Sequence, residues 1–137
     1  MPFLTTDADI VSLLRRSRTI AVVGCSANPG RDSHRVARYL LSRGYTVIPV
    51  NPTITEVLGL KACPDLAAIG HPVDIVDVFR RAQFVGQVAD AAVATGARAL
   101  WLQFDTVDED AAARASDHGL DVVADRCIMV DHRRLLA

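Results

Sequence analysis

The chain has 137 residues, half of them hydrophobic but only 5% aromatic, so we expect one domain with an aliphatic core. A net charge of −1 argues against a general nucleic-acid binder. No apolar run approaches the roughly 18 residues of a membrane span, and the N-terminal region, with Asp7 and Asp9, does not resemble a signal peptide. Three widely spaced cysteines predict no disulfide framework. We therefore expect a cytoplasmic protein without a membrane or nucleic-acid partner.

The first predicted elements are a short helix and a buried strand. The helix covers residues 7–16, where apolar residues recur at helical spacing, and Asp7 is expected to be its N-cap. Residues 19–24 form an apolar run without alternation, which is typical of a strand covered on both faces.

A polar loop leads from this strand to a second helix and a second strand. Asp32 or Ser33 is expected to cap the helix, and Gly44 stands where a left-handed residue ends one. The second strand covers residues 45–50 and stops at Asn51-Pro52, because proline has no N–H for the strand ladder. These elements make one βαβ unit.

Three further strands are predicted at residues 74–79, 97–104 and 120–124. The helices between them end at Gly96 and Gly119, where glycine suits a left-handed C-terminal residue. The alternation of strands and helices therefore continues to residue 124.

Four segments have weaker patterns. Thr106 with Glu109 fits a capping box for the last of these helices. We expect a surface loop at residues 53–64, with a helical turn around Glu56, and a short helix at residues 64–69. Residues 128–136 are expected to be a tail with a terminal helical turn.

Together these elements predict an α/β fold, a single Rossmann-like, doubly wound parallel sheet of about five strands with helices on both faces. We divide the single domain, residues 1–137, into a leading helix (1–17), a core (18–125) and a C-terminal tail (126–137). In such sheets the ligand lies beyond the carboxyl ends of the strands. The loops at that edge are polar and comprise residues 24–33, 51–53, 79–81, 103–106 and 125–127.

The loop after the first strand has the composition of an anion-binding turn that opens a helix. It departs from the dinucleotide fingerprint G-x-G-x-x-G, because Ser26 replaces the second glycine. Asn51-Pro52 also stands where NAD-binding domains place an acid for the ribose. Both departures weigh against NAD. Arginines in the ligand-end loops suit phosphate oxygens, although each is alternatively a solvated surface charge: Arg31, Arg35, Arg80 and Arg81.

Several motifs follow one another along nearly the whole chain: IAVVGCS (20–26) with Asn28-Pro29 and Arg31, Val36 with YLL (39–41) and Gly44-Tyr45, VIPVNP (47–52), VLG (57–59), VDIVDVFR (73–80), Gly96-Ala97, LWLQ (100–103), and DRCIM (125–129) with His132. In this order and spacing they resemble the small single-domain CoA-binding proteins of Rossmann type. That family is related to the N-terminal domain of the succinyl-CoA synthetase α subunit. Cys25 departs from the alanine that is common there.

The resemblance implies that coenzyme A lies over the first loop, with its diphosphate at Gly24, Ser26 and the following helix terminus. Asn51-Pro52 and Phe79-Arg80 would then border the adenosine and pantetheine portions. The candidate cofactor-binding residues are Gly24, Cys25, Ser26, Ala27, Asn28, Arg31, Ser33, Arg35, Asn51, Pro52, Phe79, Arg80 and Gln103.

The resemblance supplies no catalytic residue. Succinyl-CoA synthetase needs a phosphorylated histidine in a further domain and a nucleotide-grasping partner subunit, and none of the four histidines here stands in such a loop. We therefore expect non-catalytic binding of CoA or an acyl-CoA, with a CoA-responsive regulatory role as one version. The alternative is an NAD(P)-binding oxidoreductase or a redox sensor that uses the same crevice. A protein partner or a homodimer is left unassigned.

Cys127 has two interpretations. It is either a thiol that exchanges with CoA, promoted if Arg126 lowers its pKa, or a small buried residue that closes the sheet edge. A metal site made of Cys25, Cys127, His34 and His132 lacks the spacing of known ligand sets, so we expect no metal.

Two other features are assigned to the core. Trp101 lies in a predicted strand and is expected to be a core aromatic rather than a platform for adenine. Asp74 and Asp77 are three positions apart, and this odd spacing places them on opposite faces of their strand and argues against a shared acid–base site.

Overall fold

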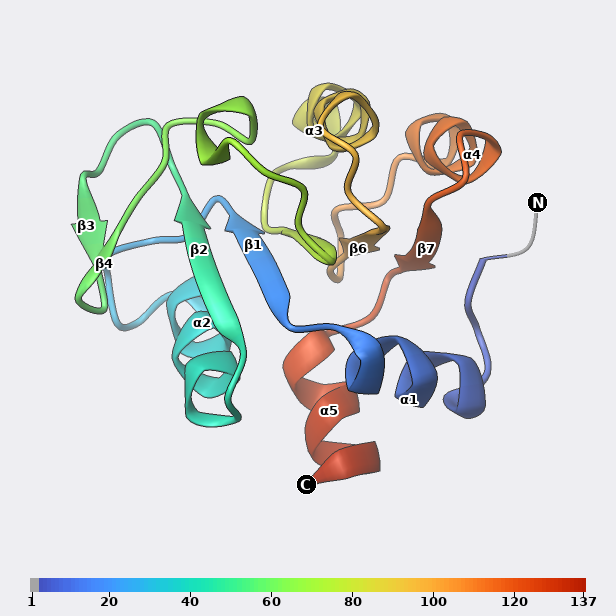
Figure 1. Cartoon of the computed structure of the whole chain (residues 1–137), viewed down its shortest axis with the longest axis horizontal. Helices are drawn as coiled ribbons and strands as arrows, with labels where there is room; N and C mark the ends of the chain where they lie inside the picture. The colour runs from blue at the N-terminus through green and yellow to red at the C-terminus, as the bar shows by residue number, and fades with distance from the viewer. Residues whose placement is uncertain (1–2) are drawn as a thin grey trace.

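A five-stranded parallel sheet organises the computed structural model, which describes residues 3–137 (Figure 1). The strand order is β2-β1-β5-β6-β7. The chain therefore adds β2 on one side of β1 and the remaining strands on the other, so the switch point lies between β1 and β5. The strands are β1 (Thr19–Val23), β2 (Thr46–Val50), β5 (Ile75–Val78), β6 (Ala99–Leu102) and β7 (Asp121–Ala124).

Helices cover both faces of this sheet, which confirms the doubly wound α/β fold. In Figure 1, α3 and α4 lie above the sheet and α1, α2 and α5 lie below it. The bounds are α1 (Asp7–Arg16), α2 (Asp32–Ser42), α3 (Ala82–Ala94), α4 (Glu109–Asp117) and α5 (Ile128–Leu136). The predicted strands and the four longer helices before residue 120 are thus present, with shorter ends in several cases.

The apolar runs in the strands are explained by this double cover. Along β1, Ile20 and Val22 pack against the layer of α1, α2 and α5, whereas Ala21 and Val23 pack against α3 and α4. Trp101 is fully buried on the α2 and α5 side, as a core aromatic, and its indole Nε1 donates to the carbonyl oxygen of Arg126 at 2.8 Å. Asp77 points to the same side as its register partners Val22 and Trp101.

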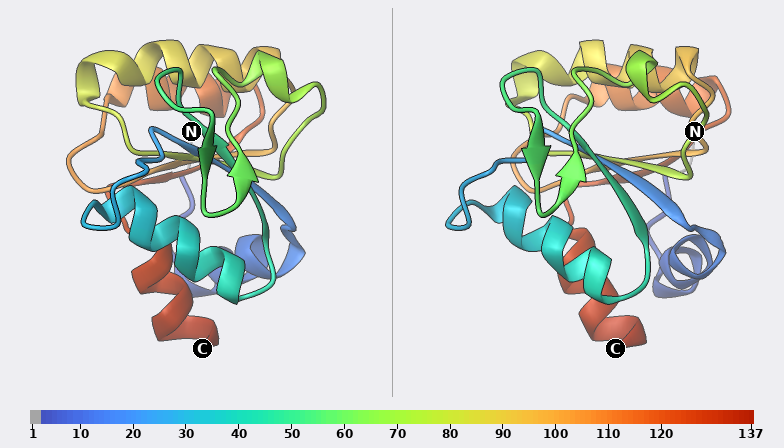
Figure 2. Two further views of the ribbon diagram at one scale, coloured as in Figure 1. Left: turned by 90° about the vertical axis from the view of Figure 1, so that its left-hand side faces the viewer. Right: turned by 60° about the vertical axis from the view of Figure 1, so that its left-hand side comes forward.

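The segment after β2 differs from the prediction. Instead of a helical turn around Glu56, the chain forms a two-stranded antiparallel hairpin of β3 (Glu56–Val57) and β4 (Leu60–Lys61). Leu58 and Gly59 both have positive φ, which matches the primed turns that join twisted strands. The chain then pairs Cys63 with Val50, and Figure 2 shows the hairpin beside the β2 edge of the sheet. The expected short helix is a 3-10 turn, η1 (Ala67–Ile69).

Three helix caps also differ from the prediction. Thr6, not Asp7, is the N-cap of α1, and its Oγ1 accepts from Asp9 N. The capping box proposed for α4 is wrong, because Asp108 caps that helix and Thr106 Oγ1 donates to the carbonyl of Gln103 instead. Neither Asp32 nor Ser33 caps α2 with its side chain.

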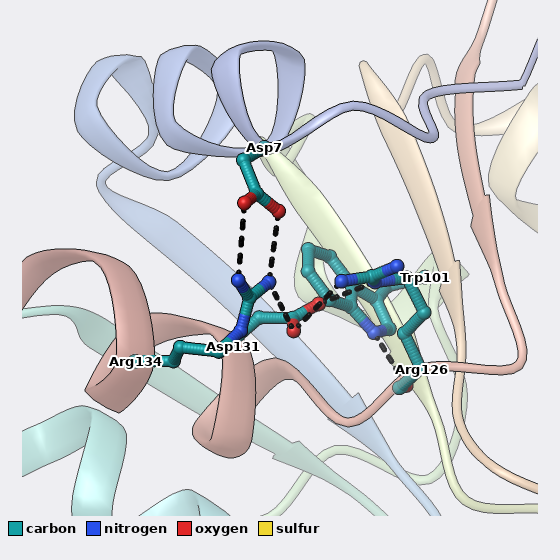
Figure 3. Close-up of polar contacts among 5 residues, drawn as sticks. All are labelled: Asp7, Trp101, Arg126, Asp131 and Arg134. Atoms are coloured by element: carbon teal, nitrogen blue, oxygen red, sulfur yellow. Dashed lines mark hydrogen bonds and ion pairs between the residues drawn. The ribbon is translucent and has the colours of Figure 1, made fainter.

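The C-terminal segment is a regular helix, α5, and not merely a tail. Asp131 on α5 is buried and accepts from Arg126 at 2.7 Å and from Arg134 at 3.3 Å. Arg134 also pairs with Asp7 of α1, and Figure 3 shows this chain of charges joining the two helices. Ion pairs thereby join the first helix to the last, and both helices pack on the face of the sheet that contains Ile20 and Trp101.

Candidate functional site

A cavity of about 480 Å³, called the large cavity below, opens beyond the carboxyl ends of β1, β5 and β6, next to the start of α5. This is the edge that the switch-point rule selects in an open parallel sheet. Its walls come from four connections, since strands far apart in the chain end side by side. The lining residues are Gly24, Ser26, Arg31, Asp32, Ser33, Arg35, Val36, Phe79, Arg80, Arg81, Gln103, Phe104, Asp105, Thr106, Cys127, Met129 and Val130.

Gly24 lets the loop between β1 and α2 approach the carboxyl end of β5. Its φ is +84°, and a Cβ at this position would collide with the carbonyl oxygen of Phe79. The adjoining Phe79 N donates to the carbonyl of Val23 at 2.8 Å. A side chain at residue 24 would therefore push the Phe79-Arg80 connection away from the loop.

The loop between β1 and α2 is held by its own hydrogen bonds. Ser26 N donates to Ser33 Oγ at 2.9 Å, and Asn28 N donates to Ser26 Oγ at 3.0 Å. Asn51 Nδ2 donates to the carbonyl oxygen of Cys25 at 2.9 Å, which ties the loop to the end of β2. Because Ser26 Oγ accepts from the loop, its proton remains available to a ligand.

Three helix N-termini at this cavity have no side-chain cap from the part of the chain that the structure describes. They are those of α2, α3 and α5, whose N-cap residues Arg31, Arg81 and Cys127 all line the cavity. By contrast, α1 and α4 are capped by Thr6 and Asp108. The first N–H groups of a helix need an acceptor, and the helix dipole favours a negative one. The cavity thus offers three partly positive backbone ends to an anionic ligand.

Guanidinium groups add to this positive field. Arg31, Arg80 and Arg81 line the cavity and form no ion pair with residues 3–137, whereas Arg35 is paired with Asp32. Arg80 lies with its guanidinium carbon 4.4 Å from the centre of the Phe84 ring, which holds it at the cavity wall. The arrangement suits phosphate groups, whose oxygens match the planar arginine fork.

A second cavity of about 210 Å³, called the small cavity below, lies on the α3 side of the same edge and shares Arg80 with the large cavity. It is mostly apolar, with Val50, Pro52, Leu66 and Phe84 in its walls. It contains two predicted site residues, Pro52 and the shared Arg80.

An apolar rim on the large cavity was not predicted. Phe104 is 57% exposed and Val130 is 45% exposed, and they are the two large hydrophobic residues recorded as exposed among the described residues. Both line the cavity, together with Met129. Phe104 is the last residue of a predicted strand and belongs to the predicted ligand-edge loop 103–106, whereas Met129 and Val130 belong to α5, which the sequence predicts to be a tail.

Buried ionisable groups lie beneath the cavity floor. Asp77 is fully buried, and desolvation raises its pKa to about 8, although the amide of Gln103 donates to it. Burial likewise raises the pKa of the Cys25 thiol to about 11. Burial also raises the pKa of the Cys127 thiol, so desolvation disfavours the thiolate form of both cysteines at this edge.

The hypothesis that Arg126 activates Cys127 is wrong. The guanidinium of Arg126 donates to both carboxylate oxygens of Asp131, at 2.7 and 3.1 Å. The pKa of Cys127 moves upward, chiefly by desolvation, rather than downward. Cys127 still lines the cavity, with its half-buried side chain at the start of α5.

Most of the predicted site residues meet in these two cavities. The large cavity brings together Gly24, Ser26, Arg31, Ser33, Arg35, Phe79, Arg80 and Gln103. Five others do not line it: Cys25 is buried beneath the loop, Ala27 and Asn28 are exposed on it, Asn51 braces it, and Pro52 lies in the small cavity.

Within residues 3–137, no group of three or more histidine, cysteine or acidic side chains is placed to hold a metal ion. His34 Nδ1 contacts the carbonyl of Ser26 at 2.9 Å, and His132 Nδ1 contacts the Tyr39 hydroxyl at 2.8 Å. None of the helices in this part of the chain combines the length and apolar character of a membrane span.

Comparison with known proteins gives a family and close relatives. A family described as "CoA binding domain" matches residues 18–133. An uncharacterized protein of Bacillus subtilis, YneT, is 45% identical over 127 residues, which cover 93% of this chain and 94% of that protein. A hypothetical protein from Pyrococcus horikoshii has a solved structure with 39% identity and a TM-score of 0.95, covering 100% of this chain and 98% of the other.

A larger protein shares the same fold in one part. The apo structure of a dinucleotide forming acetyl-coenzyme A synthetase from Ca. Korarchaeum cryptofilum aligns with a TM-score of 0.74 and 28% identity. The alignment covers 84% of this chain but 27% of the synthetase. The likeness therefore concerns one segment of that protein.

Proposed function

The chain belongs to the family of CoA binding domains, and from this membership we propose that it binds coenzyme A without transforming it. The observation that supports the proposal best is the large cavity. Among residues 3–137, three helix N-termini without side-chain caps and three arginines without an ion pair meet there. CoA carries a diphosphate and a 3′-phosphate, so it matches this positive field better than an uncharged ligand does.

The two cavities suggest how the ligand is divided. The diphosphate is proposed to lie at Gly24, Ser26 and the N-terminus of α2, where backbone N–H groups and the Ser26 hydroxyl can donate. The adenosine portion is proposed to enter the small apolar cavity at Pro52, and the pantetheine arm to follow the large cavity across Phe79 towards Gln103.

The nicotinamide alternative has less support. After β2 the chain carries Asn51 in place of a ribose-binding acid, and the Asn51 side chain is already used to hold the Cys25 carbonyl. The redox-sensor version is weakened as well, because burial raises the pKa of both cysteines near the cavity.

Calorimetric titration of the purified protein with CoA, acetyl-CoA, NAD and NADP tests the proposal. We expect saturable binding of CoA and at least about tenfold weaker binding of both nicotinamide dinucleotides. NAD lacks the third phosphate of CoA and finds no ribose-binding acid after β2, and NADP carries its third phosphate at the 2′ position instead of the 3′ position. Binding of NAD with no detectable binding of CoA would contradict the proposal. Mass spectrometry of the small molecules released on denaturation gives an independent identification.

A further inference from the structure

The most unusual polar group in the structure is the carboxyl of Asp77. It lies in the middle of the sheet on β5, between Val22 of β1 and Trp101 of β6, and is fully buried. Its Oδ1 accepts a hydrogen bond from Gln103 Nε2 at 2.5 Å. Its Oδ2 is buried without a hydrogen-bond partner among residues 3–137. Such an unpartnered atom is costly to bury, so the position calls for a specific role.

Gln103 connects this buried carboxyl to the cavity. The residue is itself buried but contributes to the lining of the large cavity. An amide has one donor end and one acceptor end, and the donor Nε2 is held by Asp77. The carbonyl Oε1 accepts no hydrogen bond from the described residues and, unlike Asp77 Oδ2, is not shut away from solvent. An acceptor is therefore presented to the cavity.

This acceptor lies where the far end of the ligand would be. β6 is two strands from β1, a spacing of roughly 10 Å, so a pantetheine arm that leaves the β1–α2 loop can reach the end of β6. Cys127 and the apolar residues Phe104 and Met129 form the surrounding wall. The ionisable side chains that line this cavity include Arg80, Asp105 and Cys127, and the Cys25 thiol is buried beneath the loop.

We propose that Gln103, oriented by Asp77, makes the site selective for CoA with a free thiol over CoA whose sulfur is substituted. The inference rests on the proposed function, because it concerns the terminal group of the same ligand. The S–H group is a donor and pairs with Gln103 Oε1, whereas a thioether or thioester sulfur has no hydrogen to donate. Asp77 is a positioning residue: it accepts through Oδ1, and a proton on Asp77 would occupy Oδ2.

Titration calorimetry with three ligands tests this selectivity: CoA, S-methyl-CoA, which is larger, and desulfo-CoA, in which hydrogen replaces the thiol. We expect the wild-type protein to bind CoA about fivefold more tightly than either analogue, because a weak S–H hydrogen bond is worth that much. Selectivity against both a larger and a smaller analogue separates hydrogen bonding from fit.

Variants then assign the selectivity to the pair. Gln103→Met removes the acceptor and should bind the three ligands within about twofold of one another. Asp77→Val should do the same, whereas Asp77→Asn keeps an acceptor for Gln103 Nε2 and should retain the preference for CoA. Thermal unfolding checks that each variant is folded. If Asp77→Val does not fold, the comparison of Asp77→Asn with Gln103→Met gives the result.

The outcomes separate this inference from the proposed function. Equal affinities of the wild-type protein for all three ligands would overturn the role of Gln103 and leave CoA binding in place. Retention of the preference in Gln103→Met would do the same. Failure of the wild-type protein to bind CoA at all would overturn the proposed function itself.

Discussion

Gly24 shows how a single residue shapes the candidate site. Two requirements meet there: a positive φ, which disfavours any side chain, and close contact with the Phe79 carbonyl, which leaves no room for one. Gly44 shares only the first requirement, because a Cβ there would meet nothing within 4 Å. The two glycines therefore distinguish backbone strain from the geometry of the site.

We predict that Gly24→Ala destabilises the fold by about 2 kcal/mol and lowers CoA affinity at least about tenfold, because the Phe79-Arg80 connection must move. Chemical denaturation and calorimetric titration measure the two effects. Gly44→Ala is the matched control, with a strain cost but an unchanged CoA affinity. An equal loss of affinity in both variants would show that strain alone is responsible.

Ser26 tests whether the first loop contacts the ligand or only keeps its shape. We predict that Ser26→Ala weakens CoA binding by about 1–2 kcal/mol, which is the scale of a hydrogen bond to a charged group. Asn28→Ala is the control, because Asn28 Oδ1 accepts from Gly30 N within the loop while the residue does not line the cavity. Calorimetric titration measures the CoA affinity of both variants. Equal losses of affinity would mean that Ser26 only maintains the shape of the loop and does not contact the ligand.

At the scale of elements, α5 is the segment whose role differs most from the prediction. It contributes Met129 and Val130 to the cavity rim and begins at Cys127 with an uncapped N-terminus. Its position depends on the buried carboxylate of Asp131, which two arginines contact (Figure 3). An element that resembles a tail in the sequence thereby becomes a wall of the candidate site.

We predict that Asp131→Ala destabilises the protein by about 2 kcal/mol, because it removes hydrogen bonds from charged groups at a buried position. Urea denaturation measures the change. Asp90→Ala provides the comparison, since the Asp90–Arg114 pair is exposed on α3 and α4 and its loss should cost less than about 0.5 kcal/mol. Similar changes in both variants would mean that Asp131 does not hold α5.

At the scale of the whole molecule, the buried carboxyl of Asp77 couples stability to pH. The ordinary pKa of the group is 3.8, and burial raises it to about 8 in the folded state. Between these values the unfolded chain releases a proton that the folded chain retains. The unfolding free energy contributed by Asp77 therefore falls as pH rises from about 4 to about 8.

We predict that Asp77→Asn, which cannot ionise, gains stability relative to the wild type as pH rises, by more than about 1 kcal/mol between pH 5 and pH 8. Urea denaturation of both proteins across this range measures the difference. Near pH 4 the two should be alike, because the carboxyl is then neutral in the folded state. A difference that does not change with pH would show that Asp77 is ionised throughout.

The ligand edge of the sheet was predictable because it follows from strand order and direction. Gly24, Phe79 and Gln103 were placed at this edge from the loop rule and the family resemblance, and all three line the large cavity. The pairing of Gln103 with Asp77 was not predictable, because the residues are separated by 26 positions and meet only where β5 and β6 lie in register. The small cavity at Pro52 depends in the same way on α3 and residues 64–66 packing beside the end of β2.

Local sequence pattern by itself determined the succession of strands and helices along the chain, the presence of helices on both faces of the sheet, and the family. Periodicity and short motifs are properties of neighbouring residues, so they can be identified without the tertiary structure. Tertiary structure decided the caps of α1 and α4, the hairpin after β2 and the docking of α5. These features depend on which distant groups supply hydrogen bonds and apolar contact. Arg134 reaching Asp7 and Trp101 donating to the Arg126 carbonyl have no local signature. The fold could therefore be predicted from the sequence, whereas the walls of the large cavity depend on how distant segments pack together.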